Sequence, residues 1–223
     1  MTKIFLATPA FLGKVNIQYA ISLTNTSLLL HERQIPLQTH ISFARSLIIL
    51  SRNEILQAFL NSDCTHILCI DSDLGWPPEA VLHLINRDRD FIGGTYPSRN
   101  DGLFRFRPLT LSDGSIVHED GLLEMAAMPA GFMLIKRHVI EKMIADTPQY
   151  AYQIKNKSKP PGHCLFNTGV IDGEFWGEDY FFCRLARQSG FRLWLDPTIN
   201  FNHDGIVGKL IDKLSLQPHN GNG

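Results

Sequence analysis

Two aspartates stand immediately after an apolar run, in the stretch ILCIDSDLGWPPE that covers residues 67–79. Asp71 and Asp73 are separated by one residue, so on an extended chain their side chains leave the same face and can converge on one point. Hard carboxylate oxygens placed in this way suit Mg²⁺ or Mn²⁺ held together with substrate phosphates. A simpler interpretation stays open, because aspartates that follow a strand often only cap the next turn.

A second acidic pair opens a helical pattern much later in the chain. Glu178 and Asp179 follow Gly177, and acids at this position are often only partners of the helix dipole. A carboxylate there can also act as a general base. The helix N-terminus lowers its pKa and weakens it as a base unless burial raises the pKa again. His203, after the last apolar segment, offers an imidazole nitrogen as a ligand or is an ordinary hydrogen-bonded histidine.

Two glycines and two tryptophans lie close to these motifs. Gly94 and Gly131 border apolar runs, where a residue without a side chain lets a sugar or diphosphate approach the backbone. Gly94 also fits a plain turn after a strand, and the run that follows Gly131 has the composition of the core. Trp76 and Trp176 flank the two acidic motifs. An indole face can stack on a sugar, and it can equally pack into the core, so both interpretations stay open.

The apolar pattern predicts the elements that must position these groups. Strand-like and helical segments alternate over the first half of the chain, which is typical of a mostly parallel sheet covered by helices. Asp71 and Asp73 then follow the third strand, at the edge where open α/β sheets form their ligand crevice. The predicted strands are residues 3–7, 37–43, 66–70 and 90–97, and the predicted helices are 16–32, 46–60 and 77–86.

The first two helices have predicted core faces. Asn16 is expected to cap the first helix, because an asparagine side chain accepts a hydrogen bond from a free backbone N–H of the first turn. Apolar residues at helical spacing then mark the buried side of each helix. They are Ile17, Ala20, Ile21, Leu28 and Leu29 in the first helix, and Leu47, Leu50, Ile55, Leu56 and Phe59 in the second.

The second half of the chain has a different character. Strand-like pieces within residues 98–127, with a turn at Asp113-Gly114, predict a small antiparallel insertion. Residues 147–176 predict a long mobile loop, and residues 210–223 predict a flexible tail. We therefore expect a single domain over residues 1–209. Its remaining elements are predicted strands at 131–135 and 191–195 and predicted helices at 138–145 and 178–189.

Composition limits the partners. The 223 residues are 44% hydrophobic, enough for a sizeable core. Twenty-one Lys and Arg balance 22 Asp and Glu, so no overall field favours nucleic acid, and local cations such as Arg45, Arg52 and Arg99 would have to meet any phosphate. No apolar run approaches the length of a membrane span, and the four cysteines lack zinc-type spacing. We expect a cytoplasmic protein, with the inner membrane face as the alternative location.

The motifs in this order resemble the GT-A fold of nucleotide-sugar-dependent glycosyltransferases, in particular small family-2-like enzymes and the glycosyltransferase domain of a large chlorella virus. The resemblance implies an α/β fold with a mixed, mostly parallel central sheet flanked by helices and a small antiparallel insertion. It rests on Thr8-Pro9, Arg45 with Arg52-Asn53, CTHILCIDSD, FIGGTYP, AGFMLIKR, WGEDYFFCRLARQSGFRLWLDP and His203.

The resemblance also implies roles for particular residues. Mn²⁺ or Mg²⁺ would be held by Asp73 and His203, with Asp71 on the metal or the donor ribose. Asp179, or failing it Glu178, would be the base that deprotonates an acceptor hydroxyl. Contacts to the donor would come from Thr8, Pro9, Arg45, Asn53, Asp71, Ser72, Asp73, Gly94, Gly131 and Trp176.

The function implied is transfer of a sugar, with inversion expected, from a UDP- or GDP-linked donor to a glycan, lipid-linked or protein acceptor. Two alternatives stay open. A haloacid-dehalogenase-like phosphatase would use the first aspartate of the D-x-D as its nucleophile, but here the motif follows the third strand and Leu74-Gly75 replaces the residues expected. A non-catalytic relative would bind a nucleotide sugar with the same Asp71 and Asp73.

Overall fold

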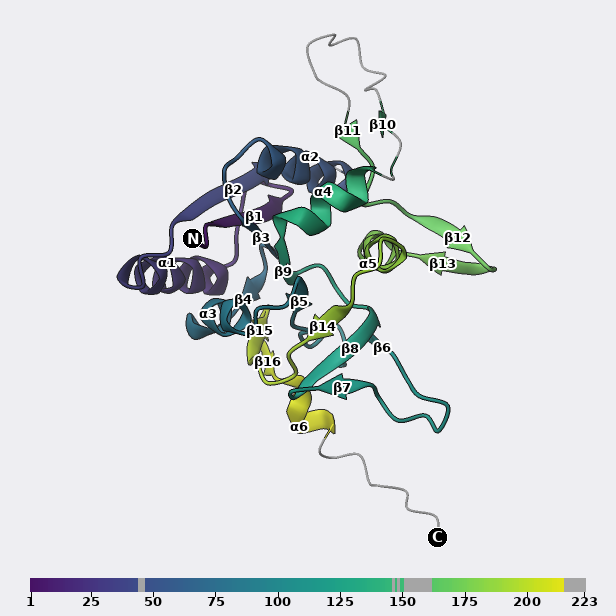
Figure 1. Cartoon of the computed structure of the whole chain (residues 1–223). Coiled ribbons are helices and arrows are strands. Elements are labelled where there is room, and N and C mark those ends of the chain that lie inside the picture. The colour runs from purple at the N-terminus through teal and green to yellow at the C-terminus, as the bar shows by residue number, and fades with distance from the viewer. Residues whose placement is uncertain (44–46, 146, 148, 151–161, 215–223) are drawn as a thin grey trace.

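The computed structural model describes residues 1–43, 47–145, 147, 149–150 and 162–214. A nine-stranded sheet runs through the molecule in the order β2-β1-β3-β9-β5-β14-β8-β6, with β7 beside β8 (Figure 1). Its strands are β1 Ile4–Ala10, β2 Leu37–Phe43, β3 His66–Ile70, β5 Phe91–Gly93, β6 Arg107–Pro108, β7 His118–Glu119, β8 Leu122–Ala127, β9 Phe132–Lys136 and β14 Leu193–Leu195.

Most strands of this sheet point the same way. β2, β1 and β3 are parallel neighbours, as are β5 and β14, whereas β9 and β8 are antiparallel to the strands beside them. The predicted mixed, mostly parallel α/β sheet is therefore confirmed. The predicted insertion is antiparallel, but it extends the main sheet through the β8–β14 pairing and does not form a separate lobe.

Helices cover both faces of the sheet and divide the core in two. On β3, Ile67 and Cys69 face one core cluster, while Leu68 and Ile70 face the other, because successive strand side chains alternate between faces. The first cluster packs under α2 Ile48–Leu60, α4 Arg137–Ala145 and α5 Glu178–Gln188, and the second under α1 Ile17–Glu32 and α3 Glu79–Asn86. None of the described helices combines the length and apolar character needed to cross a bilayer.

The predicted face of the first helix is wrong. Asn16 does cap α1, accepting from the Gln18 N–H. However, Ile17 and Leu28 are more than half exposed, and Ile21 is also exposed. The buried side contains Tyr19, Ser22, Thr26 and Leu30. The hydroxyls of Ser22 and Thr26 accept hydrogen bonds from the backbone N–H and the indole N–H of Trp76, so hydrogen bonding in place of an apolar stripe fixes this face.

The predicted boundary of the first strand and part of the second helix face also differ. β1 continues through Thr8 and Pro9 to Ala10. Beyond Ala7, β1 pairs with β2 but no longer with β3. Proline is tolerated at position 9 because one side of the strand needs no backbone N–H donor there. On α2, Leu47 just before the helix is exposed, and Arg52 and Asn53 join the buried set.

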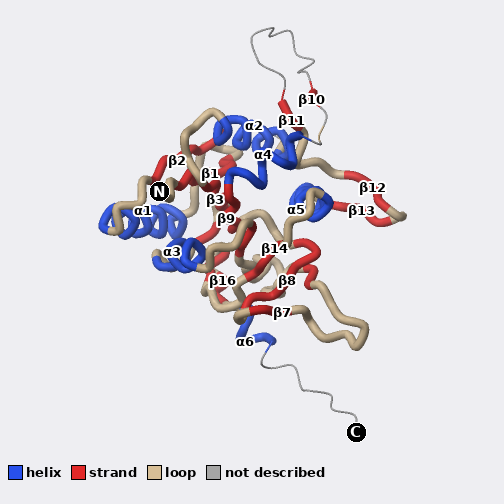
Figure 2. The backbone as a smooth tube through the Cα atoms, viewed as in Figure 1, coloured by secondary structure: helices blue, strands red, loops and turns tan. Residues whose placement is uncertain are grey.

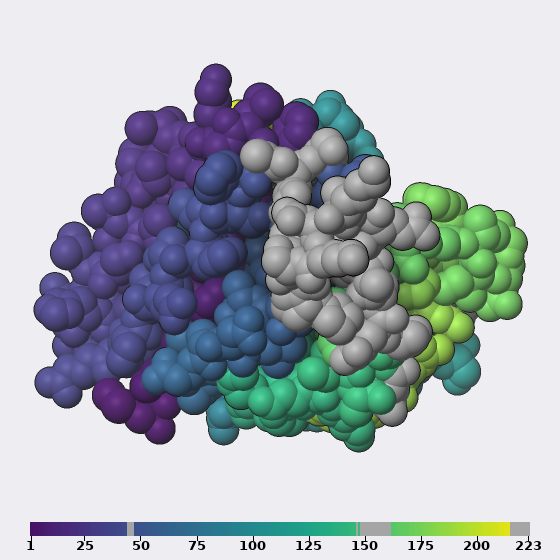
Figure 3. Space-filling model, turned by 90° about the horizontal axis from the view of Figure 1, so that it is seen from above, coloured from purple at the N-terminus to yellow at the C-terminus, as the bar shows by residue number. Residues whose placement is uncertain are grey.

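Several short elements were missed from the sequence. A small sheet, in the order β16-β15-β4, joins Leu74–Gly75, Phe201–His203 and Ile206–Gly208. The predicted loop 147–176 contains β10 Gln149–Tyr150, β11 Gly162–His163 and the hairpin of β12 Gly169–Ile171 with β13 Glu174–Trp176. Figures 2 and 3 show this β12–β13 hairpin projecting from the body. The predicted tail begins with α6 Leu210–Leu214.

Candidate active site

Asp71 lies at the carboxyl end of β3, where both of its carboxylate oxygens already have partners. Oδ1 accepts a hydrogen bond of 2.9 Å from the Arg52 guanidinium on α2. Oδ2 accepts a hydrogen bond of 3.1 Å from the Tyr96 hydroxyl. Burial and the nearby Asp71 charge raise the pKa of Tyr96 well above its usual value, so the phenol stays a donor. Asp71 is therefore a fixed hydrogen-bonded group between two elements.

Gly131 makes this contact possible. A Cβ atom at Gly131 would lie 2.1 Å from the Tyr96 hydroxyl oxygen and 2.6 Å from Asp71 Oδ2. The Gly131 carbonyl also accepts from the Asp71 backbone N–H at 3.1 Å. Any side chain at position 131 would therefore displace Tyr96 or Asp71. The contact between these two residues is enough to require glycine here, whether or not a ligand binds.

Glu178 and Asp179 begin α5 on the other side of Arg52. The Arg52 Nε atom lies 3.6 Å from Glu178 Oε1. Burial raises the pKa of Asp179 to about 6, the neighbouring Glu178 charge adds to the increase, and a hydrogen bond from the Tyr180 N–H opposes it. Burial therefore outweighs the helix N-terminus, and Asp179 has the pKa of a usable general base near neutral pH.

Arg52 connects the two acidic motifs. Its side chain is 7% exposed, and it also lies over the Phe166 ring. Burial alone would lower the pKa of Arg52. The negative charge of Asp71, with a smaller contribution from Glu178, outweighs burial and raises the pKa of Arg52. A buried guanidinium so placed holds the strand-end aspartate and the start of α5 in a fixed relation.

Loss of this guanidinium is expected to destabilise the protein. Arg52→Met removes the buried cation and leaves Asp71 and Glu178 without their partner, so we expect a loss of about 3 kcal/mol in the free energy of unfolding. Arg99→Met is the matched control, because Arg99 is 58% exposed in its ion pair and its removal should change stability by less than about 1 kcal/mol. Urea unfolding followed by circular dichroism measures both. Equal losses in the two variants would contradict this role.

Asp73 and His203 form a second corner of the site. His203 lies on β15, which pairs with β4 immediately after the aspartates, so Asp73 and His203 are neighbours. The His203 Nε2 atom lies 3.5 Å from Asp73 Oδ2, and Arg99 reaches the same oxygen at 3.2 Å. The hydrogen bond with His203 lowers the pKa of Asp73, and the same bond raises the pKa of His203.

This corner fits a divalent cation. The other ring nitrogen of His203, Nδ1, lies 2.8 Å from the Pro97 carbonyl. A carbonyl only accepts, so Nδ1 carries a hydrogen, and Nε2, on the side of Asp73, is the ring atom that would offer a lone pair to a cation after losing its proton. A backbone partner of this kind commonly orients metal-binding histidines. Two ligands are few, however, and no three His, Cys, Asp or Glu side chains of the described residues form a ready-made metal site. Substrate phosphates and water would have to complete the shell.

Two of the predicted donor-binding residues make structural contacts within the protein. Thr8 is fully buried, and its hydroxyl lies 2.6 Å from the Tyr19 hydroxyl. The Asn53 carbonyl oxygen accepts from the N–H groups of Leu165 and Phe166, and its amide donates to Phe166 O. Asn53 therefore ties α2 to the segment before the β12–β13 hairpin. Donor contact by Thr8 and Asn53 stays a prediction that would require these contacts to rearrange.

The remaining predicted residues are distributed as follows. A Cβ atom at Gly94 would lie 2.6 Å from the Phe201 ring, so packing requires this glycine. The Trp176 ring lies under two guanidinium groups, those of Arg107 at 5.0 Å and Arg184 at 5.5 Å. Pro9 is buried, the Ser72 carbonyl accepts from Asn16 N–H, and Arg45 lies outside the described residues. Trp76 is 4% exposed and belongs to the core.

The sequence did not reveal two contributors to the site. The hydrogen bond between Tyr96 and Asp71 joins residues that follow two different strands. In the sequence, only the presence of a tyrosine shortly after the glycine pair pointed to Tyr96. The carbonyl of Pro97 carries no sequence signal, because every residue has one. The structure thus brings Asp71, Arg52, Tyr96, Glu178 and Asp179 together, with Asp73, His203 and Arg99 forming the adjoining corner.

Comparison with known proteins bears on the fold. No family model and no curated protein matches the sequence. Among solved structures, the chain is similar to GalNAc-T7, crystallised with UDP, GalNAc and Mn²⁺, with a TM-score of 0.51 and 11% identity over 91% of this chain and 43% of that one. It also aligns with S. aureus TarS 1–349 in complex with UDP-GlcNAc, at a TM-score of 0.48 and 11% identity, over 87% of this chain and 56% of that one.

The similarity to these structures covers most of this chain but only part of each of the others. The chain spans less than two thirds of the length of either structure. At 11% identity, the likeness to GalNAc-T7 concerns the fold alone. The chain has the GT-A fold, as the motifs predicted.

Proposed function

We propose that this protein is a metal-dependent glycosyltransferase that moves a sugar from a nucleoside-diphosphate sugar to an acceptor hydroxyl with inversion. The arrangement that carries the proposal is the buried Asp179, whose pKa is raised to about 6, beside Glu178, which Arg52 joins to the strand-end Asp71. The GT-A fold supports it, since the similar GalNAc-T7 was crystallised with UDP, GalNAc and Mn²⁺.

Each corner of the site has a part in the proposed reaction. Asp73 and His203 would hold Mn²⁺ or Mg²⁺ against the donor diphosphate, and the bound metal would neutralise charge growing on the leaving group. Arg99, now paired with Asp73, would add positive charge there. The acceptor oxygen attacks the anomeric carbon as the bond to the diphosphate breaks, and Asp179 takes the acceptor proton. Attack from the side opposite the leaving group gives inversion.

Asp71 has a positioning part in this proposal. Both of its oxygens are engaged by Arg52 and Tyr96, so metal binding by Asp71, as the resemblance implied, would require one contact to break. The same geometry argues against a phosphatase, whose first aspartate must be free to attack phosphorus. Glu178 stays a possible alternative base, and its contact with Arg52 places it in the same site.

The raised pKa of Asp179 predicts the pH dependence of turnover. A general base must be deprotonated, so kcat/KM should be constant above neutral pH and fall about tenfold per pH unit below an apparent pKa near 6. Steady-state kinetics from pH 5 to 8 with saturating Mn²⁺ test this. A value of kcat/KM that stays constant down to pH 5 would mean that burial does not raise the pKa of Asp179 in the working enzyme.

A binding experiment tests the donor class. Calorimetric titration of the full chain with UDP-, GDP- and dTDP-sugars, with and without Mn²⁺, should give binding of at least one donor that depends on the metal. The lack of metal-dependent binding for every donor would overturn the proposed function. Binding without turnover under any condition would favour the non-catalytic alternative.

A further inference from the structure

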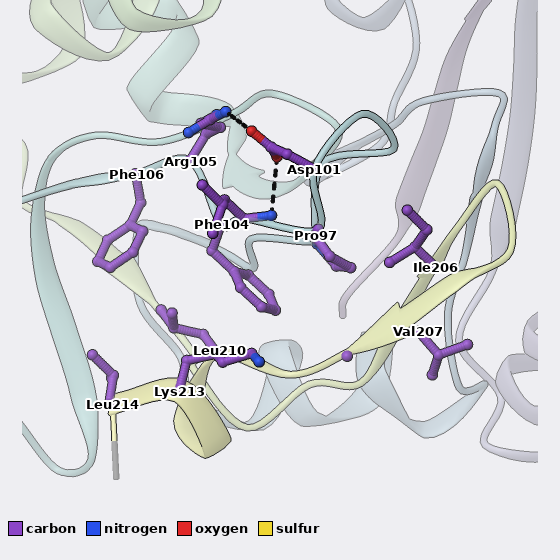
Figure 4. Close-up of a pocket in the computed structure, with 13 residues that line it drawn as sticks. Pro97, Asp101, Phe104, Arg105, Phe106, Ile206, Val207, Leu210, Lys213 and Leu214 are labelled. Atoms are coloured by element: carbon purple, nitrogen blue, oxygen red, sulfur yellow. Dashed lines mark hydrogen bonds and ion pairs between the residues drawn. The ribbon is translucent and has the colours of Figure 1, made fainter. Parts of the chain in front are cut away.

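A cavity of about 580 Å³ lies between the segment 97–106 and the C-terminal elements β16 and α6 (Figure 4). Its walls are mainly apolar, with Leu103, Phe104 and Phe106 on one side and Val207, Leu210 and Leu214 on the other. Cavities of this size and character are typical of small-molecule sites. Leu103 and Val207 are more than half exposed, so a hydrocarbon placed here would bury apolar surface that now faces water.

Among the described residues, one charged group on this cavity has no ion-pair partner. Asp101 and Arg105 form an ion pair with each other, as the dashed line in Figure 4 shows. Lys213, on α6, makes no ion pair with any of the described residues and lines the same cavity. An apolar space with one uncompensated ammonium fits a molecule that carries a hydrocarbon beside an anionic group.

The wall of the cavity is also a border of the candidate active site. Pro97 lines the cavity, and its carbonyl accepts the hydrogen bond from His203. Two residues later, Arg99 reaches Asp73. Just beyond Phe106, the guanidinium of Arg107 lies over Trp176, two residues before α5, and over Tyr180 on α5. The segment that closes the cavity therefore runs from the metal corner to the helix that carries the proposed base.

We propose that this cavity binds the hydrocarbon part of the acceptor, and that the acceptor is an amphipathic molecule with an anionic group such as phosphate near Lys213. The proposal rests on the glycosyltransferase function proposed above. Its binding component is independent of that function, because the apolar walls and Lys213 do not require a donor or a metal.

Alkyl probes test the binding component on the full chain. Octyl phosphate should bind more tightly than butyl phosphate, by up to about fourfold for each additional methylene that is buried. Leu103→Glu should weaken octyl phosphate at least tenfold. Leu111→Glu is the matched control, because both leucines are 57% exposed and only Leu103 lines the cavity. Lys213→Gln should remove the preference for octyl phosphate over octyl glucoside.

Turnover tests the acceptor component. With a donor that binds, octyl glucoside should raise release of nucleoside diphosphate several-fold above donor hydrolysis, whereas methyl glucoside should not, and Leu103→Glu should abolish the difference. Equal effects of the two glucosides, or equal behaviour of Leu103→Glu and Leu111→Glu, would overturn the inference. If octyl phosphate binds as expected but no donor binds with Mn²⁺, the proposed function fails while the cavity remains a binding site for another amphipathic ligand.

Discussion

Asp179→Asn is expected to reduce sugar transfer by about 10²- to 10⁴-fold, the usual contribution of a general base. The amide keeps the size of the side chain and can still accept from the Tyr180 N–H, but it cannot take the acceptor proton. Because Asp179 does not touch the proposed metal corner, Mn²⁺-dependent donor binding should change little. Release of nucleoside diphosphate and calorimetric donor binding, measured on the same preparations, separate the two effects.

Glu178→Gln distinguishes the two candidate bases. Glu178 lies next to Asp179 and contacts Arg52 at 3.6 Å. If Asp179 is the base, Glu178→Gln should retain a substantial part of the turnover, and the apparent pKa should move below 6 because the Glu178 charge no longer raises the pKa of Asp179. A larger loss in Glu178→Gln than in Asp179→Asn would contradict the assignment and make Glu178 the base.

Asp73→Asn is expected to weaken the binding of Mn²⁺ and thereby to lower the rate of sugar transfer. Charge stabilisation by a bound metal contributes several kcal/mol, and about 1.4 kcal/mol corresponds to tenfold in rate. We therefore expect turnover to fall on the order of 10³-fold. Electron paramagnetic resonance of Mn²⁺ in the presence of a nucleoside diphosphate measures the metal directly, without turnover, and should show the loss of the bound signal.

The matched control is an aspartate that forms an ion pair outside the candidate active site. Asp63 forms an exposed ion pair with Lys3, so Asp63→Asn removes one negative charge and should leave the Mn²⁺ signal unchanged. His203→Ala should weaken Mn²⁺ binding in the same direction as Asp73→Asn. Unchanged Mn²⁺ binding in both Asp73→Asn and His203→Ala would show that this corner does not hold the metal.

Part of the sheet could be predicted from its apolar pattern. The predicted strand 66–70 coincides with β3, whose apolar run is almost wholly buried, and the predicted strand 37–43 coincides with β2, whose apolar and polar residues alternate at the edge of the sheet. The face of α1 could not be predicted in this way. Its buried side is selected by the hydrogen bonds of Ser22 and Thr26 to Trp76, which hydrophobic periodicity does not detect.

The candidate site was predictable in its residue types but not in its connections. Asp71, Asp73, Asp179 and His203 are chemically distinctive and lie at or beside the ends of strands and helices. Their partners depend on long-range packing, because Tyr96 reaches Asp71 only where Gly131 leaves space. The small sheet that places His203 beside Asp73 has strands of two and three residues, too short for a periodic signal.

The most direct test of the central claim is the release of nucleoside diphosphate from a panel of UDP- and GDP-sugars by the full chain, measured with Mn²⁺ and again with EDTA. The predicted result is release from at least one donor with Mn²⁺ that EDTA abolishes and that Asp179→Asn reduces by about 10²- to 10⁴-fold. Release that persists in EDTA, or no release from any donor with or without added alkyl glucosides, would contradict a metal-dependent glycosyltransferase.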